Sequence, residues 1–315
     1  MSETSRARYF LMGLVLACYP SALVLARAVG LKIDPMEFIK FSAFALAVVA
    51  VFSPICSWRK IPSLRSVVEA IGFGMLMTGP IIVMAYVAAM ANQPLQDQRL
   101  IAMDQNLGID WHALIAFIDA HAMLAQTLWI AYRTFGMQLI LLPVVLGVSG
   151  QSARAYQMMA AYGLICIFAN IISIWYPALG TYTALSIDIH QFKNIDGSLG
   201  VDFPAQLLAV RNDPNFVLDR GHVSGIISFP SVHAAVAILC AWAAWPMKLF
   251  RWPVLILNVL MLSSAVPEGA HYVVDLISGI GVAGFVVALV LCVTRPYAMA
   301  KEHAMASDPI ILEQS

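Results

Sequence analysis

The residues best suited to chemistry are two histidines and an aspartate near the starts of two apolar segments. His233 follows Pro230 and Ser231, and His271 precedes Asp275 by four residues. Residues four apart share one face of a helix, so the Asp275 carboxylate can bind one ring nitrogen of His271 and leave the other free. His233 could supply a second proton-transfer group. This combination suits attack on phosphorus with protonation of the leaving oxygen.

An anion also has a place to bind in this arrangement. Ser231 is a favoured N-cap residue, and a break at residues 267–270 precedes the helix that starts at His271. One helical hairpin separates the two starts, so both lie at the same end of the bundle. Helix N-termini offer free N–H groups and partial positive charge. We therefore expect a phosphate between them, although His271 and Asp275 could instead form the proton relay of a transporter.

The elements that hold these residues are long enough to cross a lipid bilayer. The chain is 61% hydrophobic and 11% charged, whereas soluble domains are roughly one-quarter charged. A membrane-spanning helix needs about 20 apolar residues. Candidate spans cover approximately residues 9–28, 38–58, 67–91, 127–148, 156–176, 231–246, 253–266 and 271–294. We therefore predict an all-α polytopic membrane bundle.

Two polar segments interrupt these spans. Residues 92–126 alternate aspartates with leucines, a pattern typical of an amphipathic stretch that lies along the membrane surface. Residues 181–227 form a long loop that holds several cationic residues. A loop of this length between packed helices is usually functional or mobile.

The distribution of basic residues predicts the orientation. Eight spans place both termini on one side, which also carries most of the Lys and Arg residues of the short loops. The positive-inside rule puts that side in the cytoplasm. We expect a multi-pass protein of a bacterial inner membrane, with His233 and His271 on the periplasmic side. The net charge is zero, so no nucleic-acid partner is indicated, and the sequence does not specify an oligomeric state.

The order and setting of the two motifs resemble a known family. Phe229-Pro230-Ser231-x-His233, followed by His271-Tyr272-x-x-Asp275 and Gly279, is similar to the second and third signature motifs of the type 2 phosphatidic acid phosphatase superfamily. The F-P-S-x-H-A form resembles the branch that contains inositol phosphorylceramide synthases, as do residues 95–111 and the turn at 177–180. The likeness covers roughly residues 67–294 and leaves the first two spans outside a six-helix core.

The resemblance implies a role for each motif residue. His271 would attack phosphorus and form a phosphohistidine, Asp275 would orient it, and His233 would protonate the leaving group. Ser231 would bind a phosphate oxygen. No metal and no cofactor are implied, so catalysis would depend on positioning and charge stabilisation, as phosphoryl transfer generally does.

The sequence also departs from the superfamily pattern. The first signature motif is absent, and the arginine that usually stands six residues before the third-motif histidine is Ala265 here. Phosphate oxygens still need partners, and the nearest cationic residues in the chain are those of the long loop. We expect Arg211 first and Arg220 second to bind phosphate.

The sequence thus predicts a membrane enzyme for a lipid phosphate, phosphodiester or pyrophosphate, with membrane lipids around it. Transfer of the phosphoryl group to water would make the chain a lipid phosphatase. Transfer to a lipid or polyol hydroxyl would make it a phosphotransferase of the inositol phosphorylceramide synthase type. The predicted parts are an N-terminal transmembrane helix pair (residues 1–66), a catalytic membrane core (67–294) and a cytoplasmic tail (295–315).

Overall fold

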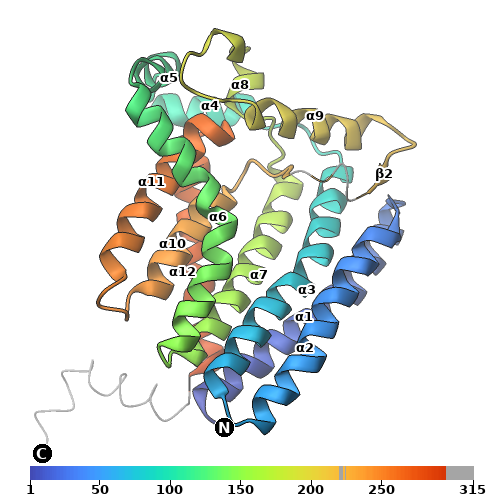
Figure 1. Ribbon diagram of the computed structural model, residues 1–315. Helices are drawn as coiled ribbons and strands as arrows, with labels where there is room; N and C mark the ends of the chain where they lie inside the picture. The colour runs from blue at the N-terminus through green and yellow to red at the C-terminus, as the bar shows by residue number, and fades with distance from the viewer. Residues whose placement is uncertain (220–222, 224, 296–315) are drawn as a thin grey trace, which may run out of the picture.

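The computed structural model describes residues 1–219, 223 and 225–295, and this part of the chain is an all-α bundle, as predicted. Seven of its helices are long and apolar enough to cross a membrane. They are α1 (Glu3–Val29), α2 (Pro35–Trp58), α3 (Pro62–Met90), α6 (Ala122–Val148), α7 (Ser152–Trp175), α11 (Arg251–Gly269) and α12 (Val273–Thr294). They run roughly side by side in Figure 1.

The remaining predicted span is shorter than expected. Helix α10 (Val232–Ala244) has 13 residues, or about 20 Å at 1.5 Å per residue, against a hydrocarbon core of about 30 Å. Its start is fixed inside the protein because Ser231 N donates to the Asp275 carbonyl oxygen at 3.0 Å, and Pro246 follows soon after its last residue. Helix α10 still packs against α6, α7, α11 and α12.

A buried ion cluster joins the first two helices to the rest of the bundle. Glu69 on α3 is fully buried, and it accepts hydrogen bonds from Arg8 at 2.5 and 2.9 Å and from Arg65 at 2.9 Å. Tyr156 on α7 donates to it at 2.7 Å, and Ser53 on α2 also donates to it. The carboxylate is therefore paired and hydrogen-bonded, the condition under which a buried charge is tolerated.

Short elements cover one end of the bundle, drawn at the top of Figure 1. They are α4 (Asp97–Asn106), α5 (Trp111–Ala120), α8 (Thr181–Ala184), the 3-10 helix Ile189–Gln191 and α9 (Leu199–Asn212). Strand β1 (Lys32–Ile33) pairs in parallel with β2 (Val217–Leu218). This pairing attaches the long loop to the turn between α1 and α2.

The two ends of the described chain meet at the opposite end of the bundle. Arg6 Nη1 donates to the Arg295 carbonyl oxygen at 3.3 Å. Helices α10 and α11 form a hairpin, so the chain returns to the same end of the bundle even though α10 is short. The short α10 therefore does not alter the prediction that both ends of the chain lie at one side of the bundle. Apart from Arg295, the predicted tail at residues 295–315 lies outside the described residues.

Candidate active site

The predicted histidine–aspartate pair is present where α12 begins, although the helix starts at Val273 and not at His271 as predicted. His271 Nδ1 lies 3.1 Å from Asp275 Oδ2, and the exposed fractions of these residues are 5% and 0%. The same carboxylate oxygen accepts hydrogen bonds from Tyr272 N and Ser228 Oγ, each at 3.0 Å. These contacts fix the carboxylate, which in turn fixes the imidazole. No described residue binds His271 Nε2, so this nitrogen is the one available for chemistry.

The N-terminus of α12 is occupied by another aspartate. Asp104 on α4 accepts hydrogen bonds from Val273 N and Val274 N, both at 2.9 Å. Trp111 Nε1 donates to the same carboxylate at 2.9 Å. The expectation that this helix start offers free N–H groups to a phosphate is therefore wrong. A protein carboxylate takes the place of the anion that a helix N-terminus favours.

The predicted closeness of the two motifs is confirmed by contacts between α10 and α12. Ser231 caps α10, since its Oγ accepts a hydrogen bond from Ala234 N at 3.3 Å. Gly279 permits the close approach, because a Cβ there would lie 2.3 Å from the Ser231 carbonyl oxygen. Ser231 is fully buried, and its predicted role in phosphate binding stays a prediction.

The second histidine lies against helix α6. The ring of His233 stacks on the ring of Tyr132, with centroids 4.1 Å apart and an angle of 11° between the planes. The Phe135 ring lies 4.5 Å away in a tilted arrangement. These two aromatic rings fix the position of the imidazole on the first turn of α10. The proton-donor role of His233 stays a prediction.

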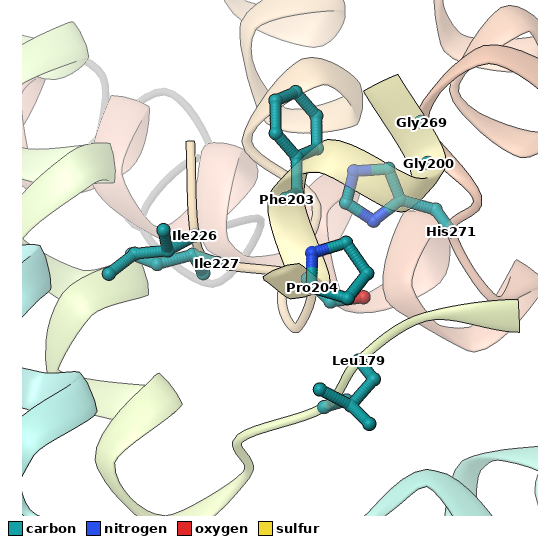
Figure 2. Close-up of a pocket in the computed structure, with 10 residues that line it drawn as sticks. Leu179, Gly200, Phe203, Pro204, Ile226, Ile227, Gly269 and His271 are labelled. Carbon is teal, nitrogen blue, oxygen red and sulfur yellow. The ribbon is translucent and has the colours of Figure 1, made fainter. Parts of the chain in front are cut away.

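A small cavity adjoins His271, and Figure 2 shows its lining. Phe203 and Pro204 of α9 lie on one side, and Ile226 and Ile227 on another. Its volume is about 20 Å³, close to the smallest space that holds one water molecule, about 10–15 Å³. A phosphate group needs more room, so substrate binding requires the covering residues to move.

A third buried aspartate, Asp97, holds several segments together at this end of the bundle. Asp97 accepts hydrogen bonds from Leu179 N at 2.9 Å and Gly180 N at 3.1 Å, and the Tyr272 hydroxyl donates to it at 2.9 Å. Thr181 N donates to the Ala270 carbonyl oxygen at 2.8 Å. The turn at 177–180 is thus linked to Tyr272 through Asp97, and the residue that follows the turn binds Ala270.

Arg211, the first of the predicted cationic residues, is bound elsewhere in the described structure and not at His271. Arg211 Nη2 donates to the Gln93 carbonyl oxygen at 2.7 Å, and Arg211 does not line the cavity. Burial lowers the pKa of the Arg211 guanidinium. Arg220 lies outside the described residues. The assignment of these arginines to phosphate therefore stays a prediction.

Sequence reasoning missed several residues that build this site. Asp97 and Asp104 were part of a stretch expected at the membrane surface, yet both are buried. The sequence feature that could have revealed them is their spacing. Asp97 and Asp104 are seven residues apart, which places them two helical turns apart on one face of a helix. Ser228 stands directly before the second motif, and Tyr132 carried no signal because it lies within an ordinary apolar span.

Fold and site together define a polytopic membrane protein with a buried histidine–aspartate pair at one end of its bundle. A family model described as the PAP2 superfamily matches residues 98–289. The match covers more than half of the chain, and the chain therefore belongs to the PAP2 superfamily, as the resemblance predicted. Its members are phosphatases and phosphotransferases that act on phosphoric esters. No curated protein and no solved structure matched the chain.

Proposed function

We propose that the chain is an integral membrane phosphatase or phosphotransferase for lipid phosphates, and that it works through a phosphohistidine at His271. The observation that supports this most directly is the 3.1 Å contact from His271 Nδ1 to Asp275 Oδ2. It fixes the ring so that Nε2 is left for attack, the orienting role that an aspartate has in hydrolase triads. Membership of the PAP2 superfamily favours this chemistry over a proton relay.

In the first step, the lone pair of His271 Nε2 attacks phosphorus and forms a P–N bond. The bond from phosphorus to the leaving oxygen breaks, and protonated His233 gives its proton to that oxygen. The proton on His271 Nδ1 remains in its bond with Asp275. The carboxylate therefore balances the positive charge of the phosphorylated imidazole.

In the second step, the acceptor attacks the phosphohistidine. Its hydroxyl proton passes to His233, the P–N bond breaks, and the electron pair returns to His271 Nε2. Water as the acceptor gives free phosphate. A lipid or polyol hydroxyl gives a new phosphoric ester, as in the inositol phosphorylceramide synthase branch.

The orientation in the membrane is part of the proposal. Basic residues in the short connections gather at the end of the bundle where Arg6 meets Arg295, and the positive-inside rule assigns that end to the cytoplasm. His271 lies at the other end, beneath α4 and α9. A site at this end of the bundle suits a lipid that has its tail in the bilayer and its phosphate at the level of the headgroups.

Arg211 is the proposed cationic ligand of the phosphate. It would have to exchange the Gln93 carbonyl oxygen, now 2.7 Å away, for a phosphate oxygen. Such an exchange fits the need for α9 to move before a phosphate can enter. Arg211→Ala should raise the Michaelis constant and lower turnover; unchanged values for both would remove Arg211 from the site.

The proposed function is tested with purified protein and three substrates offered separately. These are phosphatidic acid, undecaprenyl pyrophosphate, and a mixture of ceramide and phospholipid. Free phosphate indicates hydrolysis and a new phospholipid indicates transfer, while His271→Ala should abolish either product. Absence of both products from all three substrates would contradict the enzyme assignment.

A further inference from the structure

Tyr132 on α6 has a buried hydroxyl that has no partner among the described residues. The residue is 5% exposed, and its hydroxyl oxygen makes no hydrogen bond to any of the described residues. Glu268 also has a buried carboxylate oxygen, Oε1, to which no residue in the described part of the chain donates, yet the two groups are not bonded to each other. A buried polar group left unpaired costs free energy, so an unpartnered hydroxyl calls for an explanation.

This tyrosine lies between the two histidines of the proposed mechanism. Its ring stacks on His233 with centroids 4.1 Å apart. Its hydroxyl faces the other histidine across Gly269: a Cβ built on Gly269 would lie 3.2 Å from the Tyr132 hydroxyl and 3.4 Å from His271 Nε2. The hydroxyl and the proposed nucleophilic nitrogen therefore both lie close to one point beside Gly269.

We propose that the Tyr132 hydroxyl donates a hydrogen bond to an oxygen of the phosphoryl group while that group is transferred at His271. This inference rests on the proposed function. Ala265 stands where the superfamily usually has an arginine, and the phosphoryl oxygens gain charge in the transition state. A pre-positioned neutral donor in a site without bulk water stabilises such charge effectively. Tyr132 gains and loses no covalent bond in this role.

The variant Tyr132→Phe isolates the hydroxyl, because phenylalanine retains the ring that stacks on His233. Loss of one hydrogen bond to a charged group corresponds to a fall of about 10- to 100-fold in kcat/KM. Binding of inorganic phosphate, measured by titration calorimetry on the purified protein, should weaken about tenfold or more. The melting temperature should stay the same or rise, since the variant removes an unpaired buried polar atom.

Tyr182→Phe is the matched control, because the Tyr182 hydroxyl donates to the Pro267 carbonyl oxygen close to the same site. This control should lower the melting temperature and leave phosphate binding within about threefold of wild type, since its hydroxyl already has a partner.

The outcomes separate this inference from the proposed function. If wild type turns over none of the lipids but binds phosphate more tightly than Tyr132→Phe does, the enzyme assignment fails. The assignment of the Tyr132 hydroxyl to a phosphate oxygen is then retained. If wild type is active and Tyr132→Phe equals it in kcat/KM and in phosphate binding, the tyrosine inference is overturned. It is also overturned if Tyr132→Phe loses activity together with thermal stability, or if wild type binds no phosphate.

Discussion

Asp104 binds the backbone N–H of Val274, 170 residues further along the chain, at 2.9 Å. The contact places an acidic side chain of α4 at the N-terminus of α12, which begins two residues after His271. That helix start is therefore already neutralised by the protein. A phosphate would instead meet the Nε2 side of His271, where no described side chain is bonded.

Replacement of Asp104 by alanine should destabilise the protein and disturb the site. Two backbone N–H groups and the Trp111 indole would lose their buried acceptor, at a cost of about 2–3 kcal/mol in the free energy of unfolding. Activity should fall as well, because His271 lies two residues before the start of α12. Thermal unfolding and initial rates check this, with the exposed Asp202→Ala as control. Equal stability of the two variants would argue against the structural role of Asp104.

Gly279→Ala should separate α10 from α12. The new Cβ would lie 2.3 Å from the Ser231 carbonyl oxygen, which is backbone and cannot turn away. Overpacking of this kind costs about 1–3 kcal/mol, and turnover should fall because His233 and His271 move apart. Gly281→Ala and Gly284→Ala are matched controls on the same helix, since no atom that the structure describes lies within 4 Å of a Cβ at either position. A Gly279→Ala variant as stable and active as these controls would contradict the close-packing account.

Asp275→Asn should lower turnover by about 1,000-fold or more, because the amide no longer balances the charge on His271 or fixes its tautomer. Ser228→Ala removes one of the hydrogen bonds to the same carboxylate oxygen and should cost only about tenfold. Steady-state rates on the substrate that wild type prefers measure both effects. An asparagine variant within tenfold of wild type would rule out the orienting role of Asp275.

Acid should release the loop at residues 193–195 from α5. Partial burial would raise the pKa of Asp119, but hydrogen bonds from Asn194 N, Lys193 N and Ile195 N outweigh it and hold the pKa below its ordinary value. The stabilisation is therefore present above the unfolded pKa of about 3.9 and lost as the pH falls through the lower folded value.

Hydrogen exchange of these three amides, corrected for intrinsic rates, measures this release. Protection should be retained at neutral pH and lost on strong acidification. Asp119→Asn should lower the protection at neutral pH and remove its dependence on pH. The same acid-induced loss in Asp119→Asn would assign the effect to another group.

Local patterns explain how much of the site could be predicted. The spacing of His271 and Asp275 predicts their contact, although His271 lies two residues before α12 and the contact is made at the helix N-terminus, not along a helix face. The second-motif serine predicts an N-cap. Both contacts lie within four residues of sequence. The all-α membrane fold is likewise predicted from a local feature, the length of the apolar segments.

The contacts that sequence could not predict join distant segments. Asp104 and Val274 belong to elements far apart in the chain, and no local pattern pairs them. Arg211 was expected over the phosphate site because it is basic and lies in the long loop, but its direction depends on how α9 packs; its guanidinium binds Gln93. Helix α10 begins where Ser231 N binds the buried carbonyl oxygen of Asp275. Its length therefore depends on a contact between residues far apart in the chain.

Direct detection of a phosphohistidine tests the central claim. Wild-type protein mixed with the lipid substrate that it turns over is quenched in alkali, which preserves phosphohistidine, and its peptides are analysed by mass spectrometry. We predict a phosphoryl group on the peptide that contains His271, its disappearance on longer incubation, and its absence from His271→Ala. Product formation with no phosphoryl group on this peptide at any time, or full turnover by His271→Ala, would contradict the account.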